Sequence, residues 1–189
     1  MMSAERVFLE KGVESATIEE IARGADVSKG AFYLHFSSKA DVIEALRAHF
    51  VQGLLDRIAA AVVGRHADNW LERLTAWAQS CAAGYLDASR VHHLVFTSAP
   101  PPSREGLTRN VLIDDLTALL AGGNRGNAWS VEDPHFTAVF LFNALHGVVN
   151  REDVAGSADD RRKLLCDIDV HFRRAVGAPE TSTDRHRSG

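Results

Sequence analysis

The sequence has few of the residues that small proteins use for covalent or metal crosslinks. Only two cysteines occur among 189 residues, Cys81 and Cys166, and they lie far apart within apolar helical patterns. Two cysteines alone cannot build a disulfide framework or complete a zinc site. We therefore expect both to be packing residues, and we expect no metal and no cofactor.

Long hydrophobic runs are also missing. No apolar stretch approaches the roughly 18 residues that cross a bilayer, and the N-terminus lacks the apolar core of a signal peptide. A cytoplasmic protein without a membrane partner is expected. Apolar residues make up 46% of the chain and charged residues 24%, a composition that predicts a globular core rather than global disorder.

Excess positive charge is absent as well. The formal net charge is −4, which argues against a basic coat for non-specific nucleic-acid binding. The stretch from Val27 to Ala40 nevertheless contains no acidic residue, while Lys29, His35 and Lys39 lie within it. Such a strip meets the minimum electrostatic condition for contact with a phosphate backbone.

Alternating strand patterns are not found, and apolar residues recur at spacings of three and four. This periodicity predicts an all-α fold. Gly12 predicts the end of the first helix, Pro100–Pro102 a break and Gly122–Asn127 a flexible loop. The expected helices cover about residues 3–11, 18–24, 39–63, 69–88, 90–98, 108–120, 133–152 and 158–176, with a short helix after Ser28 that carries Ala31, Phe32 and Tyr33.

Three short helices followed by a long one predict two domains. We expect residues 1–45 to form a three-helix head and residues 46–177 to form a helical bundle. The polar residues 178–189 are expected to be a disordered tail.

The segment from Ile18 to Phe36 has the spacing of a helix-turn-helix. Thr17 is an N-cap with Glu20 three residues later, Ala22 is small enough for close helix approach, and Ser28 caps the second helix. A short exposed helix braced by another fits the major groove of DNA. By periodicity alone, a plain three-helix packing motif fits equally well.

Residue identities separate these two interpretations. The residues that carry a resemblance to a known N-terminal domain are Ile21-Ala22, Ala25-Asp26-Val27-Ser28-Lys29-Gly30-Ala31-Phe32-Tyr33-Leu34-His35-Phe36 and Lys39, preceded by Phe8, Glu10-Lys11-Gly12 and Thr17. A dozen positions agree with that domain at fixed spacing. That domain belongs to the tetracycline-repressor (TetR) family of transcriptional regulators. The remainder of the chain resembles the family only in its helical architecture.

The resemblance implies DNA contacts for eight residues. Phosphate contacts are implied for Thr17, Tyr33, His35 and Lys39, and a position nearest the bases for Ser28, Lys29, Gly30 and Ala31. Phe32 and Phe36 are expected in the core of the head.

Three departures from the family pattern bear on DNA binding. Asp26 stands where the turn usually has glycine, and aspartate tolerates the left-handed conformation but adds a negative charge. Ala31, where a hydroxyl is common, offers a methyl group suited to thymine. The sequence also begins within what is normally the first helix of the family, which predicts weak DNA binding unless the start is assigned too late.

Aromatic and polar residues in the C-terminal part indicate a small-molecule site, which needs apolar walls and a few directed polar groups. We expect a pocket between the helices at 69–88, 90–98 and 133–152. Its predicted lining is Trp77, Cys81, Phe96, Phe142, Asn143 and His146.

No paired carboxylates on an apolar face, no Ser/His/Asp pattern and no phosphate-binding glycine loop are found, so no catalytic residues and no enzyme activity are predicted. A helical-bundle enzyme that uses His92, His93 and His146 stays an alternative. The adjacent pair His92-His93 would diverge by about 100° on a helix, which makes a poor metal site.

The helix expected around Phe136–Val149 is apolar almost all round, so it must be covered on two sides. We expect a partner chain to cover one of these sides. The helices at 133–152 and 158–176 are expected to pair with their two-fold copies as a four-helix bundle. The predicted dimer interface is Phe140, Ala144, Gly147, Val148, Leu164, Leu165, Ile168, Phe172 and Val176.

Together these features predict a ligand-responsive transcriptional regulator, expected to be a repressor. A homodimer would bind palindromic double-stranded operator DNA and be released by a small apolar or amphipathic effector. Two alternatives stay open: a regulator-like ligand-binding dimer with impaired DNA binding, and the helical-bundle enzyme.

Overall fold

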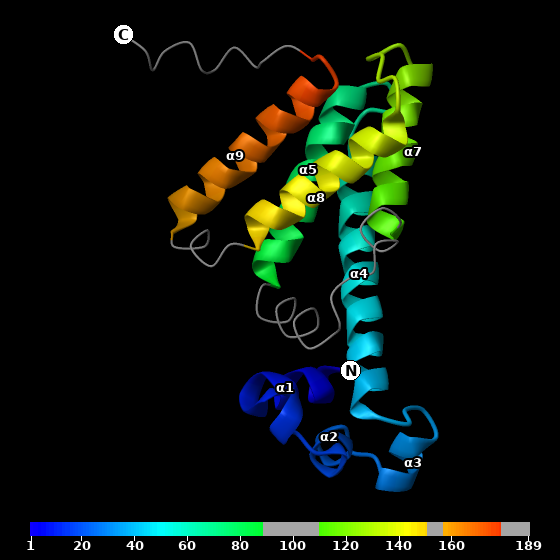
Figure 1. The fold of residues 1–189 in the computed structure, drawn as a ribbon, viewed down its shortest axis with the longest axis vertical. Coiled ribbons are helices and arrows are strands. Elements are labelled where there is room, and N and C mark those ends of the chain that lie inside the picture. Colours follow the sequence, from blue (N-terminus) through cyan, green and yellow to red (C-terminus); the bar gives the residue numbers. More distant parts are fainter. Residues whose placement is uncertain (89–109, 151–156, 179–189) are drawn as a thin grey trace. The chain divides into compact units, whose positions relative to one another are not determined.

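A computed structural model describes residues 1–88, 110–150 and 157–178 (Figure 1). Over these residues it contains eight helices and no strand, which confirms the all-α class. The predicted helix at 90–98, the break at Pro100–Pro102 and the predicted tail from residue 179 onward lie outside the described residues. The helices are α1 (Met2–Ser15), α2 (Ile18–Gly24), α3 (Lys29–Tyr33), α4 (Lys39–Val63), α5 (Trp70–Asp87), α7 (Val111–Arg125), α8 (Pro134–Val149) and α9 (Ala158–Ala175).

The chain divides into two compact units, and the division falls within α4, between Leu54 and Leu55. The first unit contains Met1–Leu54 and a further segment that begins at Asp87, and its part Met1–Leu54 is called the head. The second contains Leu55–Leu86 and the described residues from 110 onward, and is called the body. The domain boundary predicted between residues 45 and 46 stays a prediction.

The head is built from α1, α2, α3 and the first turns of α4 around Phe8, which is 1% exposed. The hydroxyl of Thr17 accepts from the Glu20 amide, and the Glu20 carboxylate accepts from the Thr17 amide. This reciprocal pair confirms the predicted start of α2. Lys11 Nζ donates a hydrogen bond to Glu20 Oε1 at 2.5 Å. This bond, and to a smaller extent the bond from the Thr17 amide, lowers the pKa of Glu20 to about 2.

Gly12 interrupts α1 without ending it. Its backbone leaves the helical region at φ +78°, and one further turn follows to Ser15. The predicted stop at Gly12 is thus confirmed as the point where the first helical segment breaks, because glycine allows the positive φ that redirects the chain, and the turn to Ser15 follows that break.

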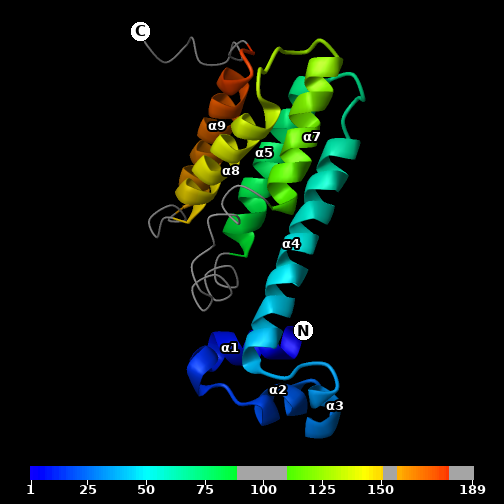
Figure 2. The same ribbon diagram turned by 45° about the vertical axis from the view of Figure 1, so that its right-hand side comes forward.

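In the body, α8 lies between α7 and α9 in both views (Figure 1, Figure 2). The helix α5 provides much of the core, since Leu74, Trp77, Cys81 and Tyr85 are all buried. Their spacing of three and four places them on one helix face.

The predicted loop at Gly122–Asn127 is wrong for its first four residues, because α7 continues to Arg125, whereas Gly126 and Asn127 do lie in a turn. Gly122 and Gly123 are buried, and a Cβ on Gly123 would lie 2.1 Å from Cε2 of Trp129. The indole N–H of Trp129 donates to the Leu120 carbonyl at 2.9 Å. These two glycines allow aromatic rings to pack closely against the helix, and they do not form a turn.

Cys81 is buried, which confirms its packing role, whereas Cys166 is exposed. The packing prediction for Cys166 is wrong because α9 turns Ile168 and Phe172 toward the core instead. Within the described ranges, no group of three or more histidines, cysteines and acidic residues could hold a metal ion. No helix in those ranges combines the length and apolar character that a membrane crossing requires.

Candidate nucleic-acid interface

The turn between α2 and α3 is held by backbone hydrogen bonds. The Val27 amide donates to the Ala22 carbonyl at 3.0 Å, and Asp26 adopts φ +56°. Asp26 thus takes the left-handed position that glycine usually fills, at little steric cost for an aspartate. Ser28 then caps α3 by accepting from the Ala31 amide at 3.1 Å, as its position in the sequence predicted.

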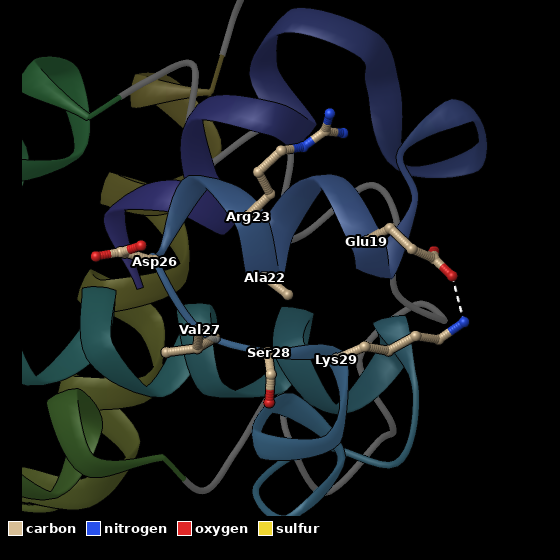
Figure 3. Close-up of a pocket in the computed structure, with 7 residues that line it drawn as sticks. All are labelled: Glu19, Ala22, Arg23, Asp26, Val27, Ser28 and Lys29. Atoms are coloured by element: carbon tan, nitrogen blue, oxygen red, sulfur yellow. Dashed lines mark hydrogen bonds and ion pairs between the residues drawn. The ribbon is translucent and has the colours of Figure 1, made fainter.

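A groove of about 420 Å³ runs along α2 and α3 (Figure 3). Its lining mixes polar and apolar surface and includes two acidic and two basic side chains. The lining residues are Glu19, Ala22, Arg23, Asp26, Val27, Ser28 and Lys29.

Lys29 and Glu19 form an ion pair across this groove (Figure 3). Their side chains are 55% and 54% exposed. The hydrogen bond between them raises the pKa of Lys29 and lowers the pKa of Glu19. The residue expected to read bases is therefore held by a carboxylate of α2, a contact that the sequence analysis missed.

The surface of α3 is exposed where the sequence predicted base contacts. Ser28, Lys29 and Gly30 are exposed, and Ala31 is half-buried. A Cβ built on Gly30 would meet only Ser28 Oγ, at 3.8 Å. Nothing in the described part of the chain covers this position, so a partner's backbone or base edge can approach it closely.

Tyr33 and His35 also lie at the surface, as a phosphate contact requires. Tyr33 is 48% exposed, and its ring stands edge-on to Phe32 at 5.7 Å between centroids. Phe32 is buried and Phe36 is packed against the same core, which confirms both as core residues of the head. Thr17 is exposed at the start of α2.

Lys39 has a structural role that the sequence did not reveal. Its ammonium donates to the carbonyls of Val13, Glu14 and Ala16, at 2.8, 2.9 and 3.2 Å. An ammonium has three donors, so all of them are used within the head. The phosphate contact predicted for Lys39 stays a prediction, and it would require exchange of one of these bonds.

In the body, two residues predicted for the effector pocket, Phe142 and His146, are in ring contact on α8. The His146 ring stacks on Phe142 at 6.0 Å and stands edge-on to Tyr85 at 5.2 Å. Burial lowers the pKa of His146. The amide of Asn143 donates to the Val139 carbonyl at 2.8 Å.

Trp77 belongs to another cluster. Its ring stacks on Phe172 at 6.1 Å, and its indole N–H donates to Asp115 Oδ2 at 2.7 Å. Cys81 is fully buried, and Phe96 lies outside the described residues. A single pocket lined by all six predicted residues thus stays a prediction.

The predicted dimer stripe is exposed on α8. Phe140 is 64% exposed, Ala144 is exposed and Val148 is half-buried. Phe136, which was not predicted in this stripe, is 67% exposed on the same helix. A Cβ on Gly147 would meet nothing within 4 Å. An exposed apolar stripe of this kind is typical of an interaction surface.

The α9 part of that prediction needs a correction. Ile168, Phe172 and Val176 are 6%, 2% and 6% exposed, so they form core within this chain and are not available to a partner. Leu164 and Leu165 are half-buried. The apolar stripe of α9 covers the body, as Phe172 shows by stacking on Trp77.

The fold and the head together define an all-helical protein with an N-terminal helix-turn-helix domain. Residues 2–46 match the family model described as bacterial regulatory proteins, tetR family. The match to this family thus covers the N-terminal domain, where the helix-turn-helix lies.

Similar proteins match different lengths of this chain. The HTH-type transcriptional repressor BepR of Brucella suis is 46% identical over 54 residues, which cover 28% of this chain and 26% of BepR. The match thus spans about a quarter of that curated relative. The A-factor receptor protein of Streptomyces griseus is 24% identical over 94% of this chain and 62% of its own length.

Solved structures agree in fold over most of the chain. A TetR/AcrR family transcriptional regulator from Thermobifida fusca is 24% identical, with a TM-score of 0.70, and the match covers 90% of this chain and 92% of that one. These relatives are named as regulators or as a receptor rather than as enzymes.

Proposed function

We propose that this chain is a homodimeric, ligand-responsive transcriptional repressor that binds a palindromic operator in the cytoplasm. The observation that carries the proposal is the helix-turn-helix head, in which α3 leaves Lys29, Gly30 and Tyr33 exposed beside a polar groove. A helix exposed in this way can enter a major groove while Thr17 and His35 contact the flanking phosphates.

Dimerisation is supported by the exposed stripe of α8 with Phe136, Phe140, Ala144 and Gly147. A two-fold contact through this stripe presents two heads to successive major grooves of one operator. Ligand response is supported by the similarity to the A-factor receptor protein, whose name describes a receptor.

The DNA-binding part is tested by fluorescence anisotropy with the protein's own promoter region. Lys29→Ala should change which operator bases are preferred, because a lysine can read guanine through O6 and N7. Tyr33→Phe should weaken binding to all sequences about equally, because a phosphate contact carries no sequence information. Wild-type affinity and preference in both variants at ~0.1 M salt would refute these assignments.

The dimer is tested by light scattering and sedimentation. Gly147→Arg should give monomers that bind the operator at least about a hundredfold more weakly, since one short helix buries too little surface for specific binding. His135→Arg, at an exposed site on the same helix but off the stripe, is the matched control. A monodisperse wild-type monomer at micromolar concentration would overturn the dimer and the palindrome together.

A second candidate is a regulator-like dimer that has lost strong DNA binding. The two carboxylates of Glu19 and Asp26 at the groove favour it, because both repel phosphate. This candidate predicts a dimer whose affinity is equally weak for promoter and unrelated DNA, an outcome that the anisotropy titration distinguishes from the first proposal.

A further inference from the structure

The body contains a cavity that lies apart from the Phe142 and His146 cluster. Its volume is about 350 Å³, within the range of small-molecule sites. It lies between the last turns of α4, the start of α5 and the second half of α7. The lining residues are Ile58, Ala59, Val62, Val63, Trp70, Arg73, Trp77, Asp115, Ala118, Leu119, Gly122 and Arg125.

One wall of this cavity is the ring of Trp70, which is seated on two glycines. A Cβ on Gly122 would lie 2.6 Å from Cζ3 of Trp70, and a Cβ on Gly126 would lie 2.2 Å from its Nε1. Any side chain at these positions would displace the indole. Because Gly122 and Gly126 lack side chains, the flat ring of Trp70 can pack against the end of α7.

A guanidinium is attached to this aromatic wall. Cζ of Arg73 lies 4.4 Å from the centroid of the Trp70 ring, and Nη1 donates to the Ala67 carbonyl at 3.3 Å. Stacking on an indole orients a guanidinium and leaves donors at its edge available. Arg73 thus offers a positioned cation rather than a mobile one.

The charges of the lining favour an anion. Arg73 and Arg125 are its basic residues and Asp115 is its acidic residue. Asp115 already accepts the indole N–H of Trp77 at 2.7 Å. Arg125 is exposed in the last turn of α7, and its side chain makes no hydrogen bond or ion pair with another residue that the structure describes.

We propose that this cavity binds a small carboxylic acid with a flat apolar body. The carboxylate pairs with Arg125 and the edge of Arg73, where a planar guanidinium matches its two oxygens. The apolar body lies among Trp70, Trp77 and the aliphatic side chains of α4. This assignment names a chemical class of effector for the proposed ligand response. Ligand binding itself does not depend on the proposed function, but an effect of the ligand on DNA binding does.

Isothermal titration with naphthoate and its neutral isostere naphthamide tests the charge requirement. Naphthoate should bind at least about tenfold more tightly, because hydrogen bonds between charged groups exceed neutral ones. Arg125→Gln should remove this preference, whereas Arg162→Gln, an exposed arginine of α9 outside the cavity, should preserve it. Equal binding of both compounds to the wild type, or an equal effect of both substitutions, overturns the proposal.

A steric pair of variants tests the location without changing charge. Ala59 and Ala60 are neighbouring exposed residues of α4, and Ala59 lines the cavity while Ala60 does not. Ala59→Trp should abolish naphthoate binding and Ala60→Trp should leave it unchanged. Loss in both variants or in neither places the ligand elsewhere and overturns the assignment.

Operator binding measured on the same preparations separates this proposal from the proposed function. If the protein binds naphthoate through Arg125 but its DNA affinity does not change, the binding site is supported and the effector role is refuted. Protein that binds DNA but shows no Arg125-dependent binding of naphthoate loses the site and keeps the DNA-binding function.

Discussion

Glycine has opposite uses in the head and in the body. In the head, a Cβ on Gly30 would meet only Ser28 Oγ at 3.8 Å, so the missing side chain leaves an open surface. In the body, a Cβ on Gly123 would lie 2.1 Å from two ring carbons of Trp129, so the Trp129 ring fills the space that a side chain would occupy. The first use serves a partner outside the molecule, whereas the second serves the core.

The same contrast holds for polar side chains. Lys29 and Glu19 form an ion pair that is about half exposed on the head. In the body, Arg173 bonds Asp169 at 2.8 Å and Thr75 at 2.7 Å, and the two charged side chains are only 12% and 14% exposed. Water can replace the first pair, but the second is part of the packing between α9 and α5.

The largest expected effect sharpens the glycine comparison. Gly123→Ala should destabilise the body by about 1–3 kcal/mol, because the new methyl group must displace the Trp129 ring. Gly53→Ala on α4, where nothing lies within 4 Å, is the control and should be neutral or stabilising, since alanine favours helix. Urea unfolding measures both. Equal unfolding midpoints would contradict the packing role of Gly123.

The sequence predicted the head well because its signals are local. Thr17 with Glu20 and Ser28 with Ala31 form their caps within three residues, so each start of a helix is visible in the sequence. The turn at Asp26 was likewise expected from the left-handed tolerance of aspartate.

The body was predicted less well because its determinants are remote in sequence. Gly122 and Gly123 look like a loop until Trp70 and Trp129 are placed against them. The apolar stripe of α9 looks like a dimer face until Phe172 is found against Trp77. Periodicity identifies an apolar stripe, but it does not say whether the same chain or a partner covers that stripe.

Lys39→Met gives the next largest effect and separates two roles for this lysine. If its main role is to bind the carbonyls of Val13, Glu14 and Ala16, the head should lose about 1–2 kcal/mol of stability without DNA. If it holds a phosphate, stability should stay unchanged, and the salt slope of DNA binding should fall by about one unit. Thermal unfolding and a salt titration distinguish these outcomes.

The pH dependence of stability offers a smaller effect, specific to the body. Burial lowers the pKa of His146, so the folded state favours the neutral ring and the unfolded state binds more protons near pH 6.5. Stability should therefore be fully present above about pH 6.5 and decrease as the pH falls toward the lower pKa of the folded state. Unfolding midpoints in urea at several pH values measure this decrease.

His146→Gln should flatten that pH dependence, because glutamine does not titrate. The matched control is His35→Gln on the exposed surface of the head. An unchanged profile in the His146 variant would show that proton binding elsewhere controls the acid sensitivity of the body.

The smallest expected effect concerns Glu19, and it is a gain in affinity. Glu19→Gln keeps the size of the side chain, removes the charge that holds Lys29 and removes one carboxylate from the groove. DNA affinity should rise about two- to fivefold at ~0.1 M salt and less at higher salt, because exposed charges are weakly coupled and screened.

Two controls make this result specific to Lys29. Glu10→Gln removes an equally exposed carboxylate of the head, paired with Arg6 at 3.8 Å and remote from the groove, and it should change affinity less. In a Lys29→Ala background most of the gain from Glu19→Gln should disappear, because the two substitutions act on one ion pair. An equal gain with and without Lys29 would mean that Glu19 acts by general repulsion of DNA, and the groove would then be no more specialised than the rest of the head surface.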